Sequence, residues 1–144
     1  MLENAIKMIE DGIITCAVIN KNGIVHTEHG RGVSPLLNIF KTQPDILKNA
    51  FVVDKIIGKA AAMILVSGGV SRAYGIVMSE AGREYLEKHG ILAGYNECVD
   101  IISNRDGTDM CPIEKSVIDT DDYKKGLEII GVTMNKLRQA ANRV

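Results

Sequence analysis

Residues 54–66, DKIIGKAAAMILV, decide the fold that this sequence predicts. From Ala60 onward every position of the run is apolar, and a helix that is apolar on all sides belongs inside a domain or between subunits. Lys55 and Lys59 are four residues apart, which places both on one face at the start of this helix. Asp54 is expected to cap it. The stretch therefore predicts a buried central helix with two lysines at its N-terminal end.

The two lysines at this end of a buried helix can be interpreted in two ways. The helix dipole disfavours cations at an N-terminus, and burial of an unpaired ammonium group is costly. One interpretation is that Lys55 and Lys59 reach solvent along their aliphatic stems. The other is that they bind a small anionic molecule, with Gly58 allowing that ligand to approach the backbone. Gly58 fits close packing against a strand equally well.

Length and composition are those of a single cytoplasmic domain spanning residues 1–144. The chain is 46% hydrophobic, mainly Ile, Val, Leu and Ala, as in a sheet covered by helices. A net charge of −1 offers no basic field for nucleic acid or a membrane surface, and 4% aromatic residues argue against base stacking. Three cysteines without a CxxC pair favour reduced thiols. We therefore expect neither nucleic acid nor a membrane as a partner.

Periodicity and turn signals predict helices that alternate with strands after an opening hairpin. The expected N-caps are Ser34, Ser79 and Thr120. The expected order is helix 2–11, strands 13–20 and 24–29 joined at Asn22-Gly23, helices 35–41 and 44–49, a short strand or lead-in at 51–53, the apolar helix from residue 54, which ends at Gly68-Gly69, strand 70–78, helix 79–89, a strand within 91–102, helix 111–117 and a long helix from residue 120. This order predicts an α/β fold, a three-layer αβα arrangement with a mixed sheet.

The layout of helix, hairpin, buried helix, strand, helix and strand resembles the cytidine-deaminase-like fold. The chain, with its KxxGKAAA segment, also resembles a small family of uncharacterised prokaryotic proteins assigned to that fold. Zinc deaminases carry a His or Cys ligand and a catalytic Glu at the start of the buried helix, and a PCxxC pair at the start of the next helix. Here residues 54–62 contain no His, Cys or Glu, and residues 79–82 contain no Cys. The resemblance implies a deaminase-like fold without zinc chemistry, and no cofactor or metal is expected.

Two further helix starts are candidates for ligand binding. Residues 30–34 place glycines before a helix, where backbone N–H groups and Arg31 could bind phosphate. The alternative is a solvated arginine at the exit of the hairpin. Ser79 and Glu80 follow a strand, at the edge where ligands gather in open α/β sheets. The alternative there is an ordinary N-cap with an acidic residue in the first turn.

Cys111 and Glu114 open the short helix 111–117, and both are candidate catalytic residues. A cysteine at a helix start favours a reactive thiolate, but a nucleophilic cysteine needs a base, and no histidine is close in sequence. Cys111 is therefore either a nucleophile or a structural thiol, and Glu114 either completes a cap or acts on a substrate. Lys59 is the third catalytic candidate, as a charge stabiliser or base. The sequence leaves open whether the protein catalyses any reaction.

The function that these patterns favour is binding of a phosphorylated or nucleotide-like small molecule near Lys55, Lys59 and the Ser79 helix start. Two other hypotheses stay open. One is a non-catalytic sensor or interaction module that acts as a homodimer through the apolar helix and the methionine-containing last helix. The other is a deaminase with unrecognised metal ligands.

Overall fold

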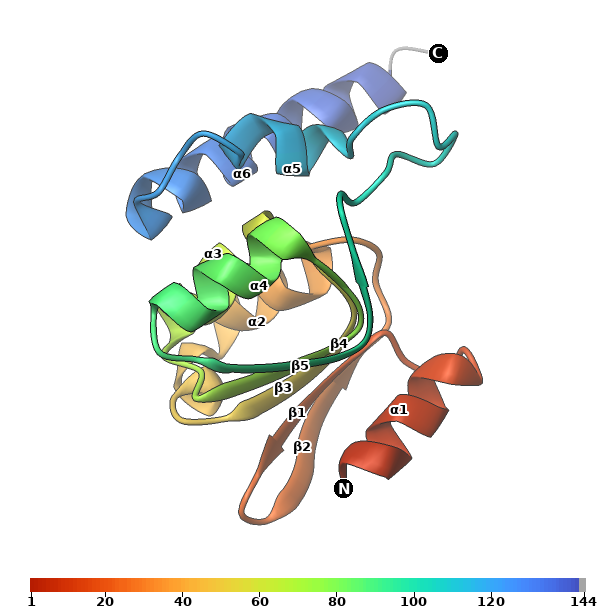
Figure 1. The fold of residues 1–144 in the computed structure, drawn as a ribbon, viewed down its shortest axis with the longest axis vertical. Coiled ribbons are helices and arrows are strands. Elements are labelled where there is room, and N and C mark those ends of the chain that lie inside the picture. The colour runs from red at the N-terminus through yellow and green to blue at the C-terminus, as the bar shows by residue number, and fades with distance from the viewer. Residues whose placement is uncertain (143–144) are drawn as a thin grey trace.

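A five-stranded mixed sheet organises the chain, and the computed structural model describes residues 1–142 of it (Figure 1). The elements are α1 (Leu2–Glu10), β1 (Cys16–Asn20), β2 (Gly23–Glu28), α2 (Ser34–Thr42), the 3-10 helix η1 (Pro44–Leu47), β3 (Phe51–Ile57), α3 (Lys59–Gly68), β4 (Arg72–Ser79), α4 (Glu80–Lys88), β5 (Leu92–Val99), α5 (Pro112–Val117) and α6 (Tyr123–Ala141). The predicted α/β class with a mixed sheet is confirmed.

The strands lie in the order β2-β1-β3-β4-β5. β1 is antiparallel to both β2 and β3, whereas β3, β4 and β5 are parallel to one another. The hairpin forms at the predicted Asn-Gly turn, where Gly23 has a φ of +104°. Because the three parallel strands end at the same edge of the sheet, the starts of α3 and α4 lie next to each other there.

Helices cover the two faces of the sheet unequally, as Figure 1 shows. α1 packs with the side chains of β1 and β3 on one face, in a small apolar cluster around Ile9 and Val53. α2, α3 and α4 lie on the other face, over the main core. α5 and α6 then pack on the outer side of α3, which adds a helical layer to the three that we predicted. This second cover explains why α3 is apolar on every side.

The boundary between β3 and α3 differs from the prediction. Strand β3 continues to Ile57 and α3 begins only at Lys59, so Lys55 and Asp54 belong to the strand. Asp54 pairs with Cys16 on β1 and with Gly75 on β4. If α3 began at Asp54, the backbone N–H and C=O groups of residues 54–57 would lose these partners in the sheet. Lys55 is exposed on β3 and does not share a helix face with Lys59, and the cap of α3 is Gly58 rather than Asp54.

Of the predicted N-caps, Ser79 is confirmed, since its side chain accepts a hydrogen bond from the Gly82 N–H. Ser34 is instead the first residue of α2, which follows Val33, and the last helix is capped by Asp122 rather than by Thr120. Among the described residues, no helix combines the length and apolar character needed to cross a membrane.

Candidate functional site

The N-terminus of α3 meets a carboxylate from a distant part of the chain. The Lys59 N–H donates to Glu114 Oε1 and the Ala60 N–H donates to Glu114 Oε2, each at 2.7 Å. Glu114 lies on α5 and is 6% exposed. One carboxylate therefore satisfies two of the unpaired N–H groups in the first turn of α3, at the positive end of the helix dipole.

Gly58 makes room for this carboxylate. A Cβ atom at residue 58 would lie 2.1 Å from Glu114 Oε1, a separation that no relaxed side chain adopts. Helix α4 also approaches Gly58 closely, because a Cβ at Gly82 of α4 would lie 2.9 Å from the Gly58 carbonyl carbon. Gly58 is thus closely approached by the Glu114 side chain and by helix α4, not by a strand, and its predicted role in ligand approach stays a prediction. In this structure the approaching group is Glu114.

Lys59 is buried and paired, so its side chain does not reach solvent along its stem. Its Nζ donates to the Ile118 carbonyl at 2.8 Å and lies 3.7 Å from Asp121 Oδ1, and the side chain is 8% exposed. The same ammonium lies 5.9 Å from the centroid of the Tyr85 ring, a cation–π contact. The contacts of the Lys59 ammonium group come from α4 and from the segment that joins α5 to α6.

Tyr85 and Asp121 complete the surroundings of Lys59, and the sequence analysis identified neither. The Tyr85 hydroxyl donates to the Asp121 carbonyl at 2.6 Å. Burial, together with the carboxylates of Asp121 and Asp122, raises the pKa of Tyr85 to about 12, so the hydroxyl remains a donor at neutral pH. The sequence signal for a role of Tyr85 in the site was weak, because an aromatic residue within an amphipathic helix is most often part of the hydrophobic core.

A hollow of about 290 Å³ opens beside Lys59, between α4 and the α5–α6 connection. This volume is at the lower end of the range of small-molecule sites. Two lysines and two acidic residues are among its lining, which consists of Lys59, Ala81, Glu84, Tyr85, Lys88, Ile118 and Asp121. The hollow is therefore small and polar, and a buried ammonium group forms part of its wall.

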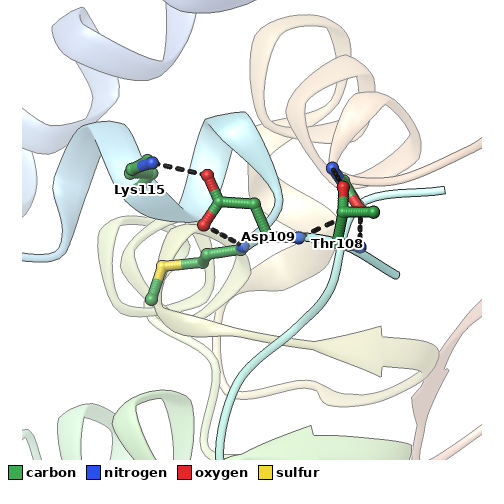
Figure 2. Close-up of polar contacts among 5 residues, drawn as sticks. Thr108, Asp109 and Lys115 are labelled. Atoms are coloured by element: carbon green, nitrogen blue, oxygen red, sulfur yellow. Dashed lines mark hydrogen bonds and ion pairs between the residues drawn. The ribbon is translucent and has the colours of Figure 1, made fainter. Parts of the chain in front are cut away.

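α5, which carries Glu114, is tied to the preceding loop by exposed contacts (Figure 2). Lys115 Nζ lies 2.6 Å from Asp109 Oδ2, and Asp109 Oδ1 accepts a hydrogen bond from the Met110 N–H. Lys115 lowers the pKa of Asp109, as expected for an ion pair. Because both side chains are more than half exposed, this pair stabilises the position of α5 only weakly.

The burial of Glu114 disfavours the ionised form of its carboxyl group. Burial raises the pKa of Glu114, whereas the hydrogen bonds from Ala60 and Lys59 and the charge of Lys59 lower it, and the balance lies above the ordinary value. The charge on the carboxylate that occupies the start of α3 is therefore more easily neutralised by acid than that of an exposed glutamate.

The other predicted site residues lie apart from this group or have ordinary roles. Cys111 is at the N-cap position of α5 and its thiol makes no capping hydrogen bond. Ser79 is buried and caps α4, while Glu80 is exposed in the first turn of that helix. Arg31 is exposed in the loop before α2. The structure thus brings together Gly58, Lys59 and Glu114, with the start of α4 next to them.

Asp54 is the buried charge that sequence reasoning misplaced. It is 3% exposed on β3, its Oδ1 accepts the Lys55 N–H, and its Oδ2 has no hydrogen-bond partner among the described residues. Burial raises the pKa of Asp54 to about 8. Its cross-strand neighbour Cys16 is fully buried, and burial followed by the charges of Asp54 and Glu28 raises the pKa of that thiol. The sequence signal that could have placed Asp54 in a strand was the abundance of β-branched residues in 51–57, which favours a strand.

The histidines and acidic residues give no metal cluster in the described part of the chain. Within residues 1–142, no three His, Cys, Asp or Glu side chains are grouped so as to hold a metal ion. His26 pairs with Glu28, and the ring of His89 lies tilted against Tyr85 and edge-on to Tyr123.

Comparisons with known proteins agree with this class of fold, an α/β domain with a mixed sheet and a buried central helix. Over residues 4–134 the chain matches the model of a family described as TM1506, a domain of unknown function (DUF1893), and it belongs to that family. It is similar to a DUF1893 family protein (TM1506) from Thermotoga maritima, with 27% identity and a TM-score of 0.79 over 94% of this chain and 88% of that one. No curated protein matches the chain.

Proposed function

We propose that this protein binds a small anionic molecule, a phosphorylated or nucleotide-like compound, at the N-terminus of α3. The observation that carries the proposal is the pair of 2.7 Å hydrogen bonds from the Lys59 and Ala60 N–H groups to one carboxylate. A helix start that already holds an anion in this way is built to hold one. In the free protein, Glu114 takes the place of the anionic group of the ligand.

Exchange of Glu114 for a ligand anion requires α5 to move away from α3. α5 has only six residues, and the ion pair that ties it to the preceding loop is exposed. The hollow beside Lys59 offers room for the rest of a small ligand, and the Lys59 ammonium adds positive charge. If a bound ligand is turned over, Lys59 is the residue placed to stabilise its charge.

The finer description of the fold belongs to the same proposal. We infer a cytidine-deaminase-like arrangement without zinc chemistry, in a cytoplasmic protein. Two observations support this inference: the starts of α3 and α4, where deaminases carry their zinc motifs, touch at Gly58 and Gly82, and the three cysteines are unpaired. Binding at this position would place the ligand at the edge where the parallel strands end.

The proposal is tested by removing the charge of Glu114. The Glu114→Gln variant is expected to bind inorganic phosphate and adenosine 5′-monophosphate at least about 10-fold more tightly than the wild type, because the competing carboxylate no longer holds the site. Isothermal titration calorimetry measures the affinities. Glu3→Gln is the matched control, since it removes the same charge from an exposed position on α1, on the opposite face of the sheet, and should change nothing. Lys59→Met in the Glu114→Gln background should abolish the gain. Folded variants that bind neither probe at millimolar concentration would contradict the proposal.

The pH dependence of anion binding gives a second test with sulfate, which does not titrate between pH 5 and 8. Because the pKa of Glu114 is raised, acid neutralises this residue at a higher pH than it neutralises an exposed glutamate. We expect the sulfate affinity of the wild type to rise as the pH is lowered. In Glu114→Gln the sulfate affinity should already be high and should depend far less on pH. Equal pH profiles for the two proteins would show that Glu114 does not compete with the anion.

A further inference from the structure

β5 leaves one edge of the sheet open. It is the last strand in the order β2-β1-β3-β4-β5, and among the described residues it pairs only with β4. Its eight residues therefore direct half of their backbone N–H and C=O groups toward solvent. Leu92 is 66% exposed, Tyr95 is 41% exposed, and Ile101, just beyond the strand, is 45% exposed. This edge combines unpaired backbone with large apolar side chains.

The opposite edge of the sheet, β2, is protected in ways that β5 is not. The pairing of β1 with β2 shifts register between Val18 and Ile19, an irregularity that blunts an edge. β2 also carries the ion pair of His26 and Glu28. β5 pairs with β4 without a register shift, contains no proline, and has Glu97 as its only charged residue. Sheet edges that stay solvent-exposed in monomers usually carry such protection, so its absence indicates a partner for β5.

Charges on α4, which packs on β5, indicate what that partner is. Arg83 lies against Cys98 of β5, and its guanidinium is 3.2 Å from Glu87, one helical turn further along α4. If a two-fold axis relates two copies of β5, the two α4 helices run antiparallel. Because Arg83 and Glu87 lie one turn apart on α4, an axis that passes level with their midpoint places Arg83 of one copy opposite Glu87 of the other, and the reverse. A patch whose charges complement those of its own two-fold copy is characteristic of an isologous interface.

We propose that two copies of this chain pair antiparallel through β5 and join their sheets into one continuous sheet across a two-fold axis. Backbone hydrogen bonds between the two β5 strands would provide the pairing, as in β-strand addition. Leu92 and Tyr95 would be covered, and the Arg83–Glu87 pairs would fix the antiparallel orientation. Glu97 does not face its own copy when the axis passes midway between the two Tyr95 residues, because it then lies opposite Ala93.

Sedimentation velocity of the full chain between 1 and 100 µM tests this interface. The wild type is expected to sediment as a dimer, with twice the 15.7 kDa mass of one chain. Tyr95→Lys places a charge at the centre of the proposed pairing and should give a monomer over the whole range. Val25→Lys is the matched control, because Val25 is also 41% exposed and lies on the other edge strand, β2. It should remain a dimer.

The charge pattern of α4 is tested by reversal. Arg83→Glu places two like charges opposite each other in the dimer and should weaken association by at least about 10-fold. The double variant Arg83→Glu/Glu87→Arg restores the complementary pairs and should recover the dimer. A wild type that is monomeric at 100 µM overturns the proposal. So does a dimer that is unaffected by Tyr95→Lys, because such a dimer forms through another surface. Circular dichroism confirms that each variant is folded.

Discussion

Asp54→Asn is expected to stabilise the protein at pH 8 by about 5 kcal/mol and to change its stability little near pH 3. The carboxyl has an ordinary pKa of 3.8 and a folded-state pKa of about 8. Between these values the unfolded chain releases the proton while the folded chain retains it, so stability falls as the pH rises. Below pH 3.8 both states hold the proton and the full stability is present. Asparagine cannot ionise, so the variant does not lose this stability.

Urea denaturation of the wild type and Asp54→Asn at pH 4, 6 and 8 measures this effect. The difference between the two proteins should grow with pH, because the other titrating groups contribute equally to both. Asp45→Asn is the control, since that side chain is 90% exposed and its loss should leave the pH profile unchanged. If Asp54→Asn instead lowers stability by the same amount at each pH, the carboxylate has a stabilising partner and the expectation is wrong.

Gly58→Ala is expected to destabilise the protein by about 3 kcal/mol, although it adds only one methyl group. The new Cβ would lie 2.1 Å from Glu114 Oε1 and 2.3 Å from its carboxyl carbon, so the carboxylate must leave the start of α3. Two buried N–H groups, those of Lys59 and Ala60, then lose their partner. Equilibrium urea unfolding gives the difference in the free energy of unfolding.

A double-mutant cycle identifies the origin of this loss. In the Glu114→Ala background, Gly58→Ala should cost no more than about 1 kcal/mol, because the group that it displaces is already absent. Gly131→Ala is the matched control on α6: a Cβ there meets nothing within 4 Å, and alanine should stabilise that helix by up to about 1 kcal/mol. Additive losses from Gly58→Ala and Glu114→Ala would show that the two residues are not coupled.

The sequence was sufficient to predict most elements of this fold. The Asn-Gly turn, the glycine that ends α3 in a left-handed conformation and the serine cap of α4 are local signals, and each is present in the structure. The unbroken apolar run from Ala60 indicated a buried helix. The apolar run did not show that α5 and α6 cover the outer side of α3. The apolar face of an amphipathic helix indicates that the helix packs against something, but it does not identify the element that it packs against.

The boundary at residues 54–58 shows where local signals are insufficient. An aspartate and a lysine before an alanine-rich run resemble a helix start, and capping preferences favour one there. Pairing with β1 and β4 keeps Asp54 in the strand instead, so the ladder outweighs the local preference. The misplacement of Lys55 and Asp54 follows from this one error.

By itself, the sequence determined the α/β class, the buried helix and Lys59 as a charged residue at its start, because spacing and side-chain chemistry are local properties of the chain. The tertiary structure alone decided which anion occupies that start and that the carboxyl of Asp54 is buried, with one oxygen unpaired among the described residues. Glu114 reaches Lys59 across 55 residues, and Asp54 became buried when β1 and β4 paired on either side of it. Contacts between residues distant in sequence leave no periodic pattern, and only folding brings them together.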